Sequence, residues 1–122
     1  MKLKKECVRD LLLYFEKNLS YENEIQANCI TLKKYTKDDI LYTSDKLLEA
    51  GLINAKKEKW ILSNQPIIIV SSITTNGHRF LDSIRSQEIW RKTKSKLKSL
   101  GSVSIEIISQ VAASVITGKL GV

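Results

Sequence analysis

The chain has 122 residues, of which 43% are hydrophobic and 27% are charged, and this balance is typical of one ordinary globular domain. No stretch approaches the roughly 20 apolar residues that a membrane-spanning helix needs. The basic start runs directly into an amphipathic segment, whereas a leader peptide would continue as an apolar run. We therefore expect a cytoplasmic protein without a membrane span.

The net charge of +7 is unevenly distributed along the chain. Residues 1–51 carry nine basic and nine acidic residues, whereas residues 52–122 carry eleven basic and four acidic residues. A one-sided basic surplus is typical of proteins that bind a polyanion such as nucleic acid. The alternative is a solvated face that only keeps the protein soluble.

The first half of the chain predicts two helices and a strand. Residues 4–18 form an amphipathic helix, because apolar side chains recur there at three- and four-residue spacing. Looser alternation over residues 24–32 predicts a short strand. The second helix begins after Thr36, an N-cap residue with Asp39 three positions on, and ends at Gly51, which suits the left-handed position after a helix.

The middle of the chain predicts a β-hairpin. Apolar residues 52–55 lead into a charged stretch, Trp60 follows, and a β-branched run over residues 67–73 lies beyond a breaker at residues 63–66. Two or three strands and a turn form this hairpin, which we interpret as a wing.

Three further helices are expected. Thr74 or Thr75 caps the first, the second is a basic helix over about residues 88–99, and the third spans residues 103–117. The third has a broad apolar face that must pack on the chain, on a second copy or on a membrane surface. Its polar face lacks the basic residues typical of membrane-surface helices. The candidate interface residues are Val103, Ile107, Ile108, Val111, Val115 and Ile116.

Helix, short strand, helix, β-hairpin wing and helix, in that order, describe an α+β fold of the winged helix-turn-helix type with extra C-terminal helices. We place a winged-helix-like domain at residues 1–85. A C-terminal helical extension at residues 86–122 packs on that domain or forms a dimer interface, and the sequence does not separate these two arrangements.

Several segments resemble a known family. They are Val-Arg-Asp-Leu-Leu-Leu-Tyr (8–14), Asp-Asp-Ile-Leu-Tyr (38–42), Leu-Leu-Glu-Ala-Gly-Leu-Ile (47–53), Ile-Thr-Thr-Asn-Gly-His-Arg-Phe-Leu-Asp-Ser-Ile-Arg (73–85), Ile-Trp-Arg-Lys-Thr-Lys (89–94) and Gly-Ser-Val-Ser-Ile-Glu-Ile-Ile (101–108). Together they resemble the domain-of-unknown-function family DUF2513, which consists of uncharacterised bacterial and phage proteins. The resemblance implies a winged-helix-like fold and a phage or mobile-element context, and it brings no established catalytic residues.

Motifs for catalysis and for metal binding are absent from the sequence. His78, the only histidine, is expected to pack or hydrogen-bond locally at a helix start rather than act in a Ser-His-Asp or Cys-His mechanism. Cys7 and Cys29 have no neighbouring ligands and are expected to be buried thiols. We therefore expect no enzymatic activity, no cofactor and no metal.

The sequence favours a DNA-binding or transcription-regulator-like module. The helix before a wing usually enters the major groove, but here residues 36–50 carry four carboxylates against two lysines, which opposes phosphates. The cations lie in the wing and the later basic helix, where we expect phosphate contacts with double-stranded DNA and little base readout. The candidate nucleic-acid-binding residues are Lys56, Lys57, Lys59, Arg85, Arg91, Lys92, Lys94, Lys96 and Lys98.

The alternative is a protein–protein interaction module, such as a phage or mobile-element accessory protein that docks on a host factor. The acidic second helix and the apolar last helix both suit this function. A homodimer through the last helix is compatible with either function.

Overall fold

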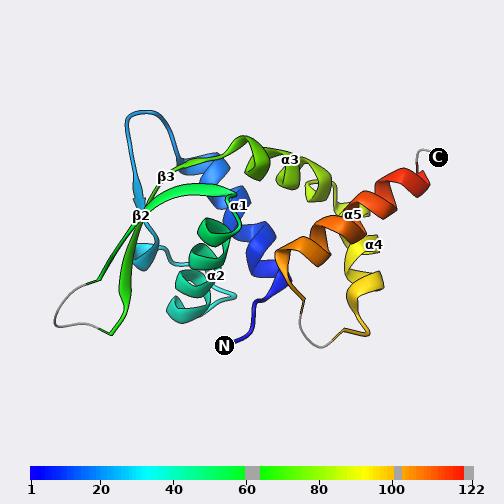
Figure 1. The fold of residues 1–122 in the computed structure, drawn as a ribbon, viewed down its shortest axis with the longest axis horizontal. Coiled ribbons are helices and arrows are strands. Elements are labelled where there is room, and N and C mark those ends of the chain that lie inside the picture. The colour runs from blue at the N-terminus through cyan, green and yellow to red at the C-terminus, as the bar shows by residue number, and fades with distance from the viewer. Residues whose placement is uncertain (60–63, 101–102, 120–122) are drawn as a thin grey trace.

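The computed structural model describes residues 1–59, 64–100 and 103–119. Within these ranges the chain forms five α-helices and a three-stranded antiparallel sheet, which is an α+β fold (Figure 1). In chain order the elements are α1 (Lys5–Asn18), β1 (Ile25–Gln26), the 3-10 turn η1 (Ala27–Cys29), α2 (Lys37–Glu49), β2 (Ile53–Lys59), β3 (Pro66–Ile73), α3 (Thr75–Ile84), α4 (Gln87–Leu97) and α5 (Ile105–Lys119). The expected strand residue Trp60 and the expected helix stop Gly101 lie outside the described residues.

Local signals set both ends of α2 and the start of α3 where the sequence predicted them, whereas α4 and α5 differ from their predicted ranges by one or two residues at each end. The Thr36 hydroxyl accepts a hydrogen bond from the Asp39 N–H at 3.0 Å, and the Asp39 carboxylate accepts one from the Thr36 N–H at 3.1 Å. This reciprocal capping box begins α2, and Gly51 follows its end with a φ of 75°. The hydroxyls of Thr74 and Ser86 cap α3 and α4 by accepting a hydrogen bond from the main-chain N–H three residues on, without the reciprocal bond.

A long hairpin dominates the sheet. β3 is the central strand, in the order β1-β3-β2, and it pairs antiparallel with both neighbours. β2 pairs with β3 from Ile53 opposite Ile73 to Lys59 opposite Pro66, with one irregularity near Asn54. Pro66, which the sequence placed in a breaker, is the first residue of β3. The prediction of a hairpin is confirmed.

The strand predicted over residues 24–32 is confined to β1, because the chain turns into η1 directly after it. The side chain of Asn28, in η1, forms hydrogen bonds to β3 that a longer β1 would otherwise form. Its amide nitrogen donates to the carbonyl of Pro66 at 3.0 Å, and its amide oxygen accepts from the N–H of Ile68 at 3.1 Å. One side chain thereby satisfies main-chain groups that a neighbouring strand would otherwise pair.

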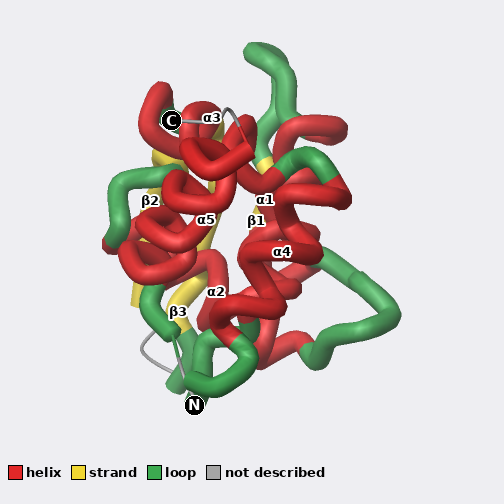
Figure 2. Tube along the Cα trace, turned by 90° about the vertical axis from the view of Figure 1, so that its right-hand side faces the viewer, coloured by secondary structure: helices red, strands yellow, loops and turns green. Residues whose placement is uncertain are grey.

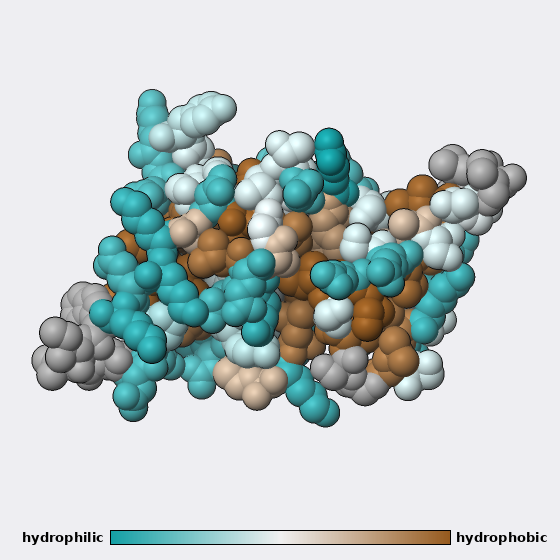
Figure 3. Space-filling model, viewed as in Figure 1, coloured by the Kyte–Doolittle hydropathy of each residue, from teal (hydrophilic) through white to brown (hydrophobic). Residues whose placement is uncertain are grey.

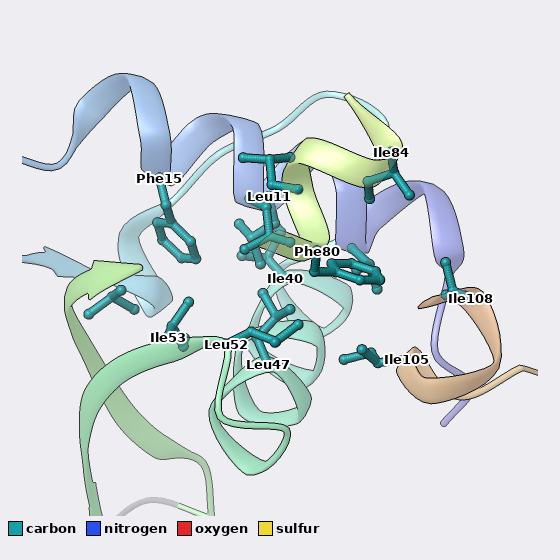
Figure 4. Close-up of a cluster of buried hydrophobic side chains, with 14 of the residues drawn as sticks. Leu11, Phe15, Ile40, Leu47, Leu52, Ile53, Phe80, Ile84, Ile105 and Ile108 are labelled. Carbon is teal, nitrogen blue, oxygen red and sulfur yellow. The ribbon is translucent and has the colours of Figure 1, made fainter. Parts of the chain in front are cut away.

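Four of the helices meet in a common apolar core. Figure 4 shows Leu11 of α1, Ile40 of α2, Phe80 of α3 and Ile108 of α5 within one cluster. Helix α4 adds further buried side chains to the same cluster. Contiguous burial of apolar surface is the main stabilising contribution to such a fold. The predicted domain boundary after residue 85 falls between α3 and α4 and stays a prediction.

The hairpin and the last two helices lie at opposite ends of the longest axis of the molecule (Figure 1). Helix α4 packs against α5 and α3. The view from that end shows α4 and α5 side by side, with the strands behind them (Figure 2). No helix within the described ranges is both long enough and apolar enough to cross a bilayer.

Candidate nucleic-acid interface

The cations of the hairpin are all on β2, and one of them is already engaged. Lys56, Lys57 and Lys59 are exposed. The Lys57 ammonium donates to both carboxylate oxygens of Asp45 in α2, each at 3.0 Å. Lys57 therefore joins the hairpin to α2, and Lys56 and Lys59 are the more accessible cations of this set.

The acidic helix α2 has most of its charge partnered within the described part of the chain. Each of its four carboxylates accepts a hydrogen bond from another side chain. The pairs are Asp38 with Gln65 at 2.8 Å, Asp39 with Lys4 at 2.9 Å, Asp45 with Lys57 at 3.0 Å and Glu49 with Lys46 at 3.0 Å. The bond from Lys4 and the cap at Thr36 hold the pKa of Asp39 below its usual range. Thr43, in the middle of α2, is buried.

Arg85 lies apart from the other cations of the C-terminal region. Its guanidinium donates to both carboxylate oxygens of Glu16 in α1, at 2.5 and 2.6 Å, and to Asp82 at 3.1 Å. The hydrogen bond from Arg85 lowers the pKa of Glu16, and the same contacts raise the pKa of Arg85. Arg85 therefore links α1 to α3, and the carboxylates of Glu16 and Asp82 largely balance its positive charge.

Helix α4 and its C-cap present the densest group of cations. The group consists of Arg91, Lys92, Lys94, Lys96 and Lys98. Lys92 pairs with Glu88 at 3.4 Å, and the Lys94 ammonium lies 5.8 Å from the centroid of the Trp90 ring. Among the described residues, Lys96 and Lys98 form no ion pair. Basic side chains near a helix C-terminus also interact favourably with the helix dipole, which helps to explain why α4 tolerates so much positive charge.

The structure separates the two predicted sets of cations. The hairpin carries Lys56 and Lys59 at one end of the molecule, and α4 carries its cations at the other (Figure 1). Hydrophilic side chains cover the hairpin end, whereas hydrophobic side chains reach the surface around α5 (Figure 3). The two sets therefore do not form one continuous patch.

Two cations that sequence reasoning missed join the α4 group. Arg9 of α1 and Lys34, in the loop before α2, line a groove of about 420 Å³ together with Arg91 and Lys94. No local pattern marks Arg9 or Lys34, because their nearness to α4 arises only when the chain folds.

The candidate interface residues of α5 divide into two groups. Val103, Ile108 and Val115 are buried within this chain. Ile107 is 37% exposed, and Val111 and Ile116 are half-buried. Packing within the chain therefore accounts for half of the apolar face. The accessible remainder is centred on Ile107.

The groups that could support catalysis or metal binding are dispersed. Nowhere in residues 1–59, 64–100 and 103–119 do three His, Cys, Asp or Glu side chains form a group that could hold a metal ion. His78 is exposed at the start of α3, beside Glu16 and Tyr21. Cys7 is buried, and burial raises the pKa of its thiol, whereas Cys29 is exposed. The expectation that both thiols are buried is therefore wrong for Cys29, because it faces outward from the short turn η1.

The chain is similar in sequence to known proteins. A family model described as "Hypothetical protein (DUF2513)" matches residues 2–104. The chain belongs to the DUF2513 family. It is also 28% identical over 121 residues to an uncharacterized protein from Haemophilus influenzae, which covers 98% of this chain and 99% of that relative. No solved structure matches the chain. In this DUF2513 protein, every candidate cation lies within the matched residues, and helix α5 lies just beyond them.

Proposed function

We propose that this DUF2513 protein is a non-catalytic binding module of winged-helix-like architecture that contacts the phosphates of double-stranded DNA through α4. The observation that carries the proposal is the concentration of five basic side chains between residues 91 and 98. Cations at this density release condensed counterions from DNA, which is the main source of affinity that does not depend on sequence. A cytoplasmic location and a phage or mobile-element context belong to the same proposal.

The order of the elements supports the winged-helix part of the proposal. A helix, a short strand, a turn and a second helix precede a long hairpin, and the first strand pairs with the second arm of that hairpin. In such a domain α2 would be the helix that enters the major groove.

The charge of α2 argues for a different use of this architecture. Its carboxylates accept hydrogen bonds from other side chains, and one of these donors is Lys57 of the hairpin, which pairs with Asp45. A surface arranged in this way offers few free cations to a phosphate backbone. The proposal therefore assigns the contacts to α4, with little direct reading of bases.

Salt-dependent binding tests this proposal. A fluorescently labelled duplex is titrated with the protein at several salt concentrations, and the slope of log affinity against log salt is measured. The variant Lys94→Gln/Lys96→Gln/Lys98→Gln is expected to make the slope shallower by about 0.9 for each lysine in contact. The matched control Lys2→Gln/Lys17→Gln/Arg79→Gln removes the same charge from exposed positions elsewhere. Absence of duplex binding by the wild type at low salt, or an equal effect of the control, would overturn the proposal.

A second candidate function is docking on another protein, either a host factor or a second copy of the chain. The observation that favours it is the accessible apolar surface of α5 at Ile107 and Val111, which lie four positions apart on one side of the helix. Sedimentation of the wild type and of Ile107→Glu tests self-association, because a charge at this exposed position should dissociate a dimer without disturbing the core. Purification from cells tests a host factor, and recovery of nucleic acid alone would count against it.

A further inference from the structure

We infer that the DNA backbone follows the groove between α1 and α4, along the side of α4 that carries Arg91, Lys94 and Lys98, with Lys34 on the facing wall. This inference rests on the proposed function and names the surface and the mode of contact. It excludes the opposite side of α4 and the hairpin as the main contact.

The groove brings cations together from three separate parts of the chain. Arg91 and Lys94 line it from α4, Arg9 from α1 and Lys34 from the loop before α2. The groove has a volume of about 420 Å³. Its lining has four basic against three acidic side chains, so the groove keeps a small positive excess that favours an anionic partner.

Helix periodicity divides the cations of α4 into two sides. Arg91, Lys94 and Lys98 are separated by three and four positions, so they lie on one side, and the first two of them line the groove. Lys92 and Lys96 are also four positions apart, but they lie on another side of the helix. The first side faces the groove, and the second side faces away from it.

Carboxylates in the groove weaken its positive charge without reversing it. Glu6, Asp10 and Glu88 line it, against four basic side chains. All three have partners, since Glu6 lies 3.9 Å from Lys5, Asp10 accepts the hydroxyl of Tyr35 at 2.6 Å and Glu88 pairs with Lys92. Lys98, on the same side of α4, adds to the positive excess.

The aromatic ring in the groove is placed for packing rather than for stacking on bases. Trp90 is only 6% exposed. Its ring is flanked by Arg9 and Lys94, each 5.8 Å from the centroid. Arg9 in turn donates to the carbonyls of Ile84 and Arg85, at 2.9 and 2.7 Å. Because these contacts cover the ring, base stacking of the kind found in single-strand binders is not available, and phosphates are the groups that the groove can hold.

Two double variants of equal charge test the inference. Lys34→Gln/Lys94→Gln changes the groove, and Lys92→Gln/Lys96→Gln changes the other side of α4. The groove pair is expected to make the salt slope shallower by about 1.8, because each lysine in contact with B-form DNA contributes about 0.9, and the other pair is expected to leave the slope unchanged. Lys34→Arg/Lys94→Arg keeps the charge and should restore the wild-type slope, which separates a lost contact from a damaged fold.

The outcomes separate the inference from the proposed function. If the wild type binds duplexes and the Lys92/Lys96 pair matters as much as the groove pair, the groove is not the main contact, and the proposed contact through α4 stands. If Lys56→Gln/Lys59→Gln in the hairpin has the larger effect, both the groove and the assignment of the contacts to α4 are overturned, and only DNA binding remains. A strong preference among duplexes of equal length and different sequence would also overturn the inference. Failure of the wild type to bind any duplex at low salt would remove both.

Discussion

Gly77, in the first turn of α3, lies so close to the main-chain carbonyl oxygen of Leu52 that a side-chain carbon at this position would overlap it. The same oxygen accepts a hydrogen bond from the N–H of Thr74 at 3.0 Å. The end of α2, the start of β2 and the start of α3 therefore meet at one point. The glycine makes this close approach of two backbone segments feasible.

Replacement of Gly77 by alanine is expected to lower the free energy of unfolding by about 1–3 kcal/mol, because the carbonyl of Leu52 is part of the main chain and cannot rotate away. Alanine is otherwise more favourable than glycine in a helix by about 1 kcal/mol. A loss of stability in Gly77→Ala would therefore indicate the overlap with the Leu52 carbonyl. Gly118→Ala, in α5, is the matched control, since nothing lies within 4 Å of the added carbon there. Urea denaturation of both variants gives the comparison, and a Gly77→Ala protein as stable as the wild type would contradict this packing.

Removal of the Asn28 side chain is expected to destabilise the sheet. Asn28→Ala leaves the N–H of Ile68 and the carbonyl of Pro66 without these partners, at a cost of about 1–3 kcal/mol. Asn28→Asp keeps the acceptor and removes the donor, so it should lower the free energy of unfolding less than Asn28→Ala does. Asn54→Ala serves as the control, because the side-chain amide of Asn54 donates to the Ser72 hydroxyl at the surface and to no main-chain group of the described residues. Equal stability of the Asn28 and Asn54 variants in chemical denaturation would refute this role.

Tyr35 makes the stability of the protein sensitive to alkaline pH. Its burial, followed by the 2.6 Å hydrogen bond from its hydroxyl to Asp10, raises its pKa. A raised folded-state pKa means that the neutral phenol stabilises the fold fully below about pH 10, the ordinary pKa of tyrosine, and that this contribution is lost as the pH rises toward the folded-state value.

Tyr35→Phe is therefore expected to be less stable than the wild type near neutral pH and to lose stability less steeply above about pH 10. Thermal melting at a series of pH values provides the measurement. Tyr21→Phe removes an exposed phenol and should follow the wild-type slope. If Tyr35→Phe keeps that slope as well, the Tyr35–Asp10 bond does not have this effect.

Arg85 is expected to affect stability rather than DNA affinity, although its position in the sequence suggested a phosphate contact. Arg85→Gln removes the ion pair with Glu16, and an exposed pair of this kind contributes about 0.2–1 kcal/mol. Because Arg85 lowers the pKa of Glu16, this contribution is present above about pH 4.3, the ordinary glutamate value, and is lost as the pH falls through the lower folded-state pKa. The stability difference between Arg85→Gln and the wild type should thus narrow between neutral and strongly acidic pH. A shallower salt slope for Arg85→Gln would show that it contacts DNA after all.

The predictions that succeeded depended on neighbouring residues. The capping box of Thr36 and Asp39, the positive φ of Gly51 and the Thr74 cap all act within four positions of sequence, so the chain alone reveals them. The strand over residues 24–32 was overestimated because alternation cannot show that Asn28 replaces a strand with its side chain.

The candidate site was harder to predict because charge in the sequence does not show which cations are engaged. Arg85 and Lys57 counted toward the basic surplus, yet each is bound by a carboxylate far away in the sequence. Arg9 and Lys34 were overlooked for the opposite reason, since they reach the groove only through the packing of α1 against the rest of the fold. The net charge of a region therefore does not show which of its cations lie together on one surface.

The cations of α4 lie on a helix that packs mainly on two other helices, α3 and α5. Trp90 and Leu97 anchor it in the same apolar cluster as Leu11 of α1 and Ile108 of α5. Substitutions among these buried side chains can change the spacing and direction of the lysines while the net charge stays constant. The packing of the core thus determines where the surface lysines lie. Two variants with the same net charge can therefore have different electrostatic potentials at the surface.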